Sequence, residues 1–556
     1  MLAESADEDD ASSEPLAIIF ALIDDVGMND ITNSVDIAEA TPHISKLASE
    51  GVELSRYYAQ ACCTPGRAAI LSGRYSWRSG MQYGNLFNDS PFGLAAHYEL
   101  LPEVMQKQNY ATHIVGKWDV GAYAHDMWPT KRGFDSFFGM VGDAFDWVTH
   151  KADLDYAHED DFYTDLHENE SNAHGWEGNY STWMWGNRTV AIIDEHARAK
   201  PEQGLFVYLA LNAMHDSVVL PGAKIGQWLE VAMQERLAQN VGSTRLQFAA
   251  GMMLVDDVIG DVVKAVKAAG LYKRSLVVIT SDNGAPTPQA GGVNGGSNYP
   301  YRGGKMYYME GGVRVPAYVH SPLISKAMRG HEYRGLFHAS DWLPTLGYLA
   351  GAAAGSLAFA DGVDHGGILF DEADDTASHL RTTVPLMITY LGYNESGEGG
   401  NGAFVADLPA TNRTSGGTYK IMMNTPKIYW YGPEDNEHFC SNGANGTHCT
   451  GFSFSDYPTY MLYDLGNDPF ETTNLWAQLE YRAVRANMAR LFCAAYLTMT
   501  PSNYQASNLT SARKAFNDNV NYTTWTVETT TQSVYESVRW ATPTMGNCTF
   551  AAFMDA

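Results

Sequence analysis

Short apolar runs, each bounded by polar or turn residues, recur along the first two thirds of the chain. They occupy residues 16–23, 111–115, 205–211 and 275–280. Continuous apolar runs of this length predict strands that are buried on both faces of a parallel sheet. Periodic segments with helical spacing lie between these runs, at residues 41–51, 99–108 and 246–270. The last of them ends at Gly270, which is suited to cap the C-terminus of a helix.

The alternation of strands and helices predicts an α/β fold with a large, mainly parallel sheet sandwiched by helices. In such folds ligands bind outside the carboxyl ends of the strands, where the connecting loops converge. Polar residues follow all four predicted strands: Asp24 with Asp25, then Lys117, His215, and Asp282 with Asn283. We therefore expect carboxylate, amide, imidazole and ammonium groups to meet at one edge of the sheet.

The amino-acid composition changes near residue 373, where Gly, Ser, Thr and Asn become frequent. Strand candidates at 384–390, 419–423 and 460–463 precede a helical stretch at 477–496. The chain is thus divided into an acidic N-terminal tail (1–15), a large domain (16–372) and a smaller C-terminal α+β domain (373–556). Residues 150–174 are rich in Asp, Glu and His and are predicted to form a solvated loop, because their spacings fit no metal-ligand template.

The composition and net charge of the chain exclude some classes of binding partner. The 556 residues include 36 Lys and Arg against 64 Asp and Glu, which gives a formal charge of −28, and 45% are hydrophobic. This composition is globular rather than disordered. Its acidity argues against nucleic acid as a partner, because the phosphate backbone would be repelled. No apolar run approaches the ~20 residues that span a bilayer, so no membrane span is expected.

Cysteine and asparagine patterns favour the secretory route, with an extracellular or lysosomal destination. Four late cysteines could form two bridges, most simply Cys440–Cys449 and Cys493–Cys548, although sequence does not fix the pairing. Ten Asn-x-Ser/Thr sites predict glycans on surface loops: Asn88, Asn169, Asn179, Asn187, Asn394, Asn412, Asn445, Asn508, Asn521 and Asn547. Residues 1–15 hold no apolar signal segment, which implies that a leader has been removed or lies upstream.

The most specific motif is Cys63-Thr64-Pro65-Gly66-Arg67, which continues to Leu71-Ser72-Gly73-Arg74. It resembles the signature of the sulfatase family, in which a formylglycine-generating enzyme oxidises the cysteine to formylglycine and the hydrated aldehyde is the nucleophile. The resemblance runs from about residue 16 to about 476 and is closest to the arylsulfatase B group, within the alkaline-phosphatase-like superfamily. It implies that residues 16–372 form a catalytic domain and that a sulfated carbohydrate or aryl sulfate is the substrate.

The resemblance also implies roles for the residues that follow the strands. Residue 63 and four others would bind a divalent cation: Asp24, Asp25, Asp282 and Asn283. Oxygen ligands of this kind suit Ca²⁺, or Mg²⁺, better than zinc. Arg67 and Lys117 would stabilise the hydrated aldehyde, while His215 and Lys305 would bind sulfate, one of them protonating the departing alcohol.

One position departs from the family pattern. Asp119 stands where the second signature usually has a histidine, in Gly116-Lys117-Trp118-Asp119. Its carboxylate could act as the base that restores the aldehyde, but it would also repel a bound sulfate and remove one positive neighbour from the site. Three interpretations follow: an active sulfuric ester hydrolase, a phosphonate or phosphodiester hydrolase with the same machinery, and a sulfated-glycan-binding protein that has lost turnover.

Overall fold

The computed structural model covers the chain from residue 16 to residue 500 with several gaps. The residues left undescribed within this span are 83–84, 88–89, 154–161, 217, 238–240, 288–292, 371–379, 390–400, 411–415, 424–459, 497 and 499. Residues 1–15 and 501–556 also lie outside the description.

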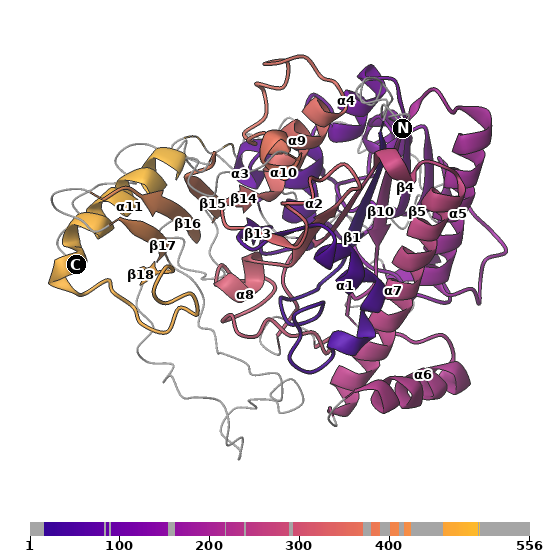
Figure 1. The fold of residues 1–556 in the computed structure, drawn as a ribbon, viewed down its shortest axis with the longest axis horizontal. Helices are drawn as coiled ribbons and strands as arrows, with labels where there is room; N and C mark the ends of the chain where they lie inside the picture. The colour runs from indigo at the N-terminus through magenta and orange to yellow at the C-terminus, as the bar shows by residue number, and fades with distance from the viewer. Residues whose placement is uncertain are drawn as a thin grey trace, which may run out of the picture.

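A ten-stranded sheet forms the centre of the molecule (Figure 1). Its five central strands are mutually parallel, in the order β11 (Ser275–Ser281), β1 (Ala17–Ile23), β10 (Gly204–Leu211), β4 (Tyr110–Lys117) and β5 (Ser136–Met140). Every residue of β1, β10 and β11 is buried, as continuous apolar runs predict for strands covered on both faces. The predicted α/β fold is confirmed.

Shorter strands extend the sheet at both edges. Beyond β11 lie β12 (Ala317–His320) and β2 (Val52–Leu54), both joined by antiparallel pairing, and then β13 (His331–Tyr333), parallel to β2. Beyond β5 lie β8 (His167–Glu168) and β9 (Ser171–Asn172), both antiparallel. Antiparallel additions at the edges of a parallel sheet make the whole sheet mixed but mainly parallel.

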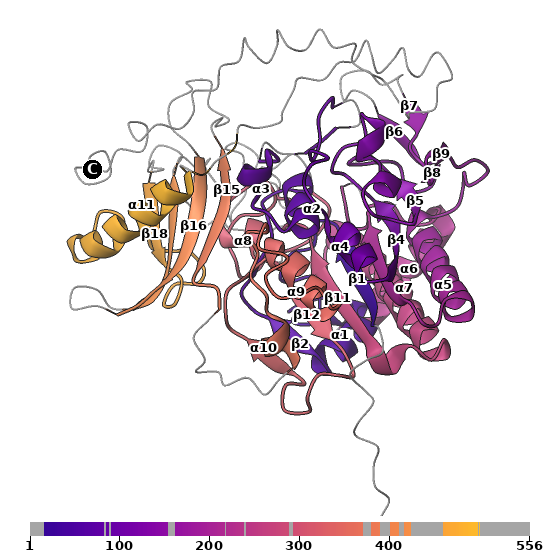
Figure 2. The same ribbon diagram turned by 90° about the horizontal axis from the view of Figure 1, so that it is seen from above.

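Helices cover both faces of this sheet (Figure 2). One layer contains α1 (Pro42–Ser49), α5 (Ser181–Ala199), α6 (Ala223–Arg236) and α7 (Ser243–Ala268). The other layer contains α2 (Cys63–Ser72), α4 (Leu101–Lys107) and α9 (Trp342–Leu349), which pack against one another. Gly270 follows α7 with φ 78°, a left-handed conformation that glycine adopts without strain.

A second, antiparallel sheet lies beside the main one. It runs in the order β15 (Thr383–Thr389), β16 (Asn401–Leu408), β17 (Gly417–Met423) and β18 (Tyr460–Asp464), and α11 (Arg482–Tyr496) packs against it (Figure 1). Trp77 of α3 (Ser76–Ser79) belongs to the apolar core between α11 and the second sheet, so a segment of the large domain packs against the C-terminal part. Cys493 of α11 is disulfide-bonded, whereas Cys440, Cys449 and Cys548 lie outside the described residues.

The prediction of a solvated loop at residues 150–174 was wrong for the part that the structure describes. This segment contains β6 (Lys151–Asp153) and β7 (Phe162–Thr164) as well as β8 and β9. Asp165 and His167 are buried because the Asp165 carboxylate accepts hydrogen bonds from the backbone of Val141 and Gly142 and from His167. The acidic and imidazole groups therefore satisfy one another and a neighbouring loop.

Three of the predicted glycan sites can be placed in the structure. Asn169, Asn179 and Asn187 are exposed, and the other seven predicted glycan sites lie outside the described residues. No described helix combines the length and the apolar character that crossing a bilayer requires.

Candidate active site

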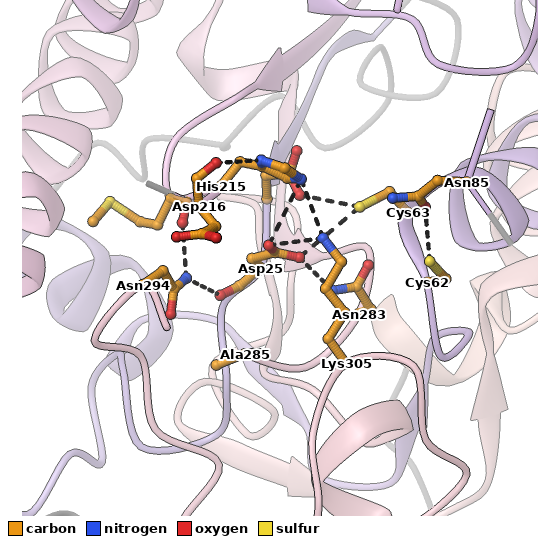
Figure 3. A network of polar contacts seen from close by, with 12 residues as sticks. Asp25, Cys62, Cys63, Asn85, His215, Asp216, Asn283, Ala285, Asn294 and Lys305 are labelled. Atoms are coloured by element: carbon orange, nitrogen blue, oxygen red, sulfur yellow. Dashed lines mark hydrogen bonds and ion pairs between the residues drawn. The ribbon is translucent and has the colours of Figure 1, made fainter. Parts of the chain in front are cut away.

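The polar residues that follow the central strands meet at the carboxyl edge of the sheet (Figure 3). Parallel pairing places Ile23 opposite both Leu211 and Ser281, so the loops after β1, β10 and β11 leave the sheet at the same level. The side chains delivered there are Asp24, Asp25, Lys117, His215, Asp282 and Asn283. All are fully buried except His215, whose side chain keeps a small exposed face.

Helix α2 brings Cys63 to this cluster as its first residue. The Cys63 Sγ atom lies 3.4 Å from Asp24 Oδ1 and 3.9 Å from Asp25 Oδ1. Burial raises the pKa of this thiol well above its usual value. Glycine is needed one turn along, because a Cβ atom at Gly66 would lie only 2.4 Å from the Asp282 carbonyl oxygen. The smallest residue at this point thus allows α2 to approach the loop after β11 closely.

The oxygen-rich part of the site fits a hard divalent cation. Ligand atoms of Asp24, Asp25, Cys63 and Asp282 all lie within 4.8 Å of one another. Asn283 donates to Asp25 Oδ1 at 2.6 Å, while its own Oδ1 is buried and has no hydrogen-bond partner in the described part of the chain. A buried amide oxygen that accepts no hydrogen bond is suited to ligate a hard cation. The donor set therefore fits the predicted Ca²⁺ or Mg²⁺.

Two buried cations balance the carboxylates on the α2 side. The Arg67 guanidinium contacts Asp282 Oδ2 at 2.8 Å and Asp24 Oδ2 at 3.2 Å. Lys117 Nζ lies 2.8 Å from the same Asp24 oxygen. Burial alone would raise the pKa of Asp24, but Lys117 and Arg67 together hold it well below its usual range. Asp24 is therefore ionised at neutral pH.

Lys305 and His215 form a second pair, next to Asp25 (Figure 3). Lys305 Nζ donates to Asp25 Oδ2 at 2.9 Å and lies 3.2 Å from His215 Nε2. His215 Nδ1 lies 2.9 Å from the carbonyl oxygen of Asp216, which can only accept. Nδ1 therefore carries the proton and Nε2 accepts from Lys305. Burial and the neighbouring Lys305 hold the pKa of His215 well below its usual value, so this imidazole is neutral.

Asp119 enters the site from the end of β4 and is held by the first turn of α2. Its Oδ1 accepts from Thr64 Oγ1 at 2.7 Å, and Thr64 Oγ1 in turn accepts from the Leu86 backbone N–H at 2.9 Å. Its Oδ2 lies 3.5 Å from Lys117 Nζ and 4.0 Å from Arg67 Nε, and it has no hydrogen-bond partner among the described residues. The carboxylate thus braces the helix that carries Cys63 and adds negative charge beside two cations.

Three residues of the site were missed in the sequence. Asp143, buried beyond the end of β5, interacts electrostatically with Asp119, Lys117 and Lys305, and burial raises its pKa to about 7. Asn294 donates to the backbone carbonyl oxygens of Asp25 and Met214, and Thr64 supports Asp119 as described above. Only Asp143 carried a signal, since it follows a strand as the other site residues do.

Comparison with known proteins gives a consistent picture. The sulfatase family model matches residues 17–352. Mouse arylsulfatase J is 31% identical over 88% of this chain and 77% of its own length. Bovine arylsulfatase A is 29% identical over 86% and 87%, and mouse N-acetylgalactosamine-6-sulfatase is 29% identical over 63% and 65%. These relatives represent several kinds of sulfatase and do not single out the arylsulfatase B group.

Solved structures extend the likeness at the level of the fold. Ps i-CgsB in complex with k-i-k-neocarrahexaose has a TM-score of 0.67 at 23% identity, covering 91% of this chain and 98% of that chain. A phosphonate monoester hydrolase from Silicibacter pomeroyi has a TM-score of 0.54 at 16% identity, covering 88% and 96%. At such low identity these likenesses establish the architecture alone.

Proposed function

Because the chain belongs to the sulfatase family of sulfuric ester hydrolases, we propose that it releases inorganic sulfate from a sulfated carbohydrate or an aryl sulfate. The observation that carries this proposal is the buried convergence of Cys63 with an oxygen-rich cation site and three cationic side chains. Residue 63 would act as formylglycine, made by a formylglycine-generating enzyme, and its hydrate would be the nucleophile. The Cys-x-Pro-x-Arg core that this conversion needs is intact.

The cation would be held by Asp24, Asp25, Asp282, Asn283 and the side chain at position 63. When bound, it would polarise the ester oxygens and favour ionisation of the attacking hydroxyl. Arg67 and Lys117 hold the carboxylates in place and present positive charge to the sulfate oxygens, in a buried setting where such charge is effective.

Lys305 is the better candidate for the proton donor to the departing oxygen. His215 is neutral, and its Nε2 already accepts a hydrogen bond from Lys305, so in this arrangement it has no proton to give at that atom. Lys305 bears the proton, and His215 orients it and can accept one of its hydrogens. In this scheme His215 positions Lys305, and Lys305 protonates the departing oxygen.

Sulfate release from 4-nitrophenyl sulfate by the matured protein tests the proposal. Cys63→Ala should abolish release, whereas Cys62→Ala should retain it, because Cys62 Sγ contacts Asn85 and Met306 rather than the carboxylates. Mass spectrometry of the Cys63 peptide should find an aldehyde. Absence of sulfate release from converted protein would sink the proposal, and faster hydrolysis of the matching phosphate esters would favour the phosphonate or phosphodiester alternative.

The second candidate function, binding of sulfated glycans without turnover, is favoured by one observation. The buried Asp119 carboxylate lies beside Lys117 and Arg67, where it weakens their attraction for sulfate. Asp119→His distinguishes the two. If the wild type binds a sulfated sugar without hydrolysing it and the variant hydrolyses it, the binding function is correct. If the wild type already turns over, Asp119 is compatible with catalysis.

We also propose a class of sugar substrate and a cellular location. A sulfated hexosamine is the sugar we propose, because mouse N-acetylgalactosamine-6-sulfatase is among the relatives of this chain. A secretory route is supported by the disulfide at Cys493 and by the exposure of Asn169, Asn179 and Asn187.

A further inference from the structure

Asn294 links the backbone of the cation site to the backbone that carries His215. Its side-chain Nδ2 donates to the Asp25 carbonyl oxygen at 3.1 Å and to the Met214 carbonyl oxygen at 2.8 Å (Figure 3). Asp25 is a ligand of the candidate cation site. Met214 directly precedes His215, whose Nε2 accepts from Lys305. One amide group therefore holds together the loops after β1 and β10, which carry a cation ligand and the partner of the proposed proton donor.

Buried hydrogen bonds fasten the segment that carries Asn294 to helix α7. Within the segment, Asn294 Oδ1 accepts from the Gly296 backbone N–H at 2.8 Å. Arg245, near the start of α7, donates through Nη1 to the Gly295 carbonyl oxygen at 3.0 Å and to Asp30 Oδ1 at 2.5 Å. The Asn294 amide is thus oriented by its own turn and by a side chain of another element.

Arg245 can serve as a fixed anchor because its side chain is buried and every nitrogen of its guanidinium is bonded. Nε and Nη2 donate to the two carboxylate oxygens of Asp36 at 2.9 and 2.8 Å, and Nη2 also donates to the Asn29 carbonyl oxygen at 2.9 Å. Bidentate pairing of a guanidinium with a carboxylate fixes orientation as well as distance. Asp36 and Asn29 follow β1 in the chain, as Asp25 does, so the anchor and the cation ligand are joined through the same segment.

Loss of the Asn294 amide would remove a donor from two buried carbonyl oxygens. Asp25 and Met214 are both fully buried, so water does not readily replace that donor. A buried acceptor that loses its donor is costly, and the backbone shifts to relieve it. Such a shift would move His215, and with it Lys305, relative to the cation. Displacements of about 1 Å between reacting groups can lower a rate on the order of 10²-fold.

We propose that Asn294 is a positioning residue that sets the Lys305–His215 pair against the cation site and thereby promotes protonation of the departing oxygen, an inference that rests on the proposed sulfatase activity of the same site. Its contribution should increase with the dependence of a substrate on that proton.

Two aryl sulfates of similar shape test this role. 4-Nitrophenolate is a weak base that departs without a proton, whereas 4-methoxyphenolate is more basic and gains from one. In saturating Ca²⁺, Asn294→Ala should lower kcat/KM for 4-methoxyphenyl sulfate about 10–100-fold and for 4-nitrophenyl sulfate no more than about threefold. The ratio kcat/KM is compared because it includes the step that breaks the bond to the departing oxygen.

Binding of Ca²⁺ gives a second readout that needs no turnover. Because Asn294 holds the backbone of Asp25, Asn294→Ala should weaken Ca²⁺ binding about tenfold, as loss of a group that orients a metal ligand typically does, measured by titration calorimetry. Asn294→Asp keeps the acceptor for the Gly296 N–H and removes both donors, so it should reproduce the selective loss of activity. This variant carries the comparison of esters if Asn294→Ala does not fold.

Asn474 provides the matched control, because it also joins backbone segments but does so in the C-terminal part. Its Oδ1 accepts from the backbone N–H groups of Leu462 and Trp476, and its Nδ2 donates to the Tyr460 carbonyl oxygen. Asn474→Ala should change neither the ratio between the two esters nor the binding of Ca²⁺.

Four outcomes would overturn the inference: equal losses for the two esters, unchanged Ca²⁺ binding in Asn294→Ala, wild-type behaviour of Asn294→Asp, or the same changes in Asn474→Ala. Failure of the wild type to release sulfate from either ester would instead overturn the proposed function.

Discussion

A buried ion network joins the C-terminal sheet to the segment that carries Lys305, and Lys420 of β17 is its centre. Lys420 Nζ lies 2.9 Å from Glu310 Oε1 and 2.9 Å from Glu471 Oε1, and all three side chains are fully buried. The Glu310 backbone N–H donates to Glu471 Oε2 at 2.8 Å, and Tyr58 donates to Glu310 Oε2 at 2.9 Å. Lys420→Met keeps most of the volume of the side chain and removes only its charge.

The expected loss is large because two carboxylates would stay behind. Removing one partner of a buried ion pair typically destabilises a protein by about 3–5 kcal/mol. Arg314, 3.5 Å from Glu310, would compensate one carboxylate, and Glu471 would keep no ion-pair partner among the residues that the structure describes. The control is Lys46→Met, since Lys46 is 65% exposed and pairs with Glu50 at 3.4 Å. Exposed pairs of this kind contribute about 0–1 kcal/mol.

The pH dependence of the Lys420→Met effect identifies its cause. Burial already raises the pKa of Glu471, and loss of Lys420 raises it further. As the pH falls through that raised pKa, the folded variant binds a proton that the unfolded chain does not, so part of the lost stability returns. Urea unfolding at pH 8 and pH 5 should therefore show a smaller difference from wild type at pH 5. A loss below about 1 kcal/mol at pH 8, or equal losses at both values, would refute the network.

Three further predictions concern the cation, the proton and the glycans. Asn283→Ala should weaken Ca²⁺ binding about 10–100-fold, as loss of an oriented metal-site group typically does, measured by titration calorimetry. Asp143, whose pKa is about 7, loses its charge as the pH falls from 8 to 6, so KM for an anionic ester should decrease over that interval, and Asp143→Asn should flatten the change. When the protein is produced in a secreting host and then deglycosylated enzymatically, mass spectrometry should find Asn169 and Asn179 converted to Asp. Asn187 should be converted less, because its partner Thr189 is buried within α5.

The parts of the fold that the sequence predicted are those with a local cause. Strand β1 is apolar on both faces because helices cover both sides of the sheet, and this produces an uninterrupted run that periodicity reveals. The polar residues after such runs converge because parallel strands end at the same edge. The pattern of strands alone therefore predicts that Asp24, Asp282 and His215 lie together, although their chemical roles came from the resemblance.

The parts that were missed depend on distant partners. The segment at 150–174 looked solvated because its Asp and His residues are polar, and nothing local shows that Asp165 would accept hydrogen bonds from the loop at Val141. Lys420 likewise reads as an ordinary strand residue, since its two glutamates lie 110 positions before it and 51 after it. Asp143 follows a run broken by Gly139, which hid the strand before it.

The charge balance of the site leads to an order of binding. Five buried carboxylates face three cations in the cluster: Asp24, Asp25, Asp119, Asp143 and Asp282 against Arg67, Lys117 and Lys305. His215 adds no charge because its pKa lies well below neutrality. The site thus has up to two excess negative charges, which one divalent cation balances. An anionic ester would be repelled until that cation is present, so KM should rise steeply as free Ca²⁺ is lowered. A finite KM that persists in excess chelator would contradict this order.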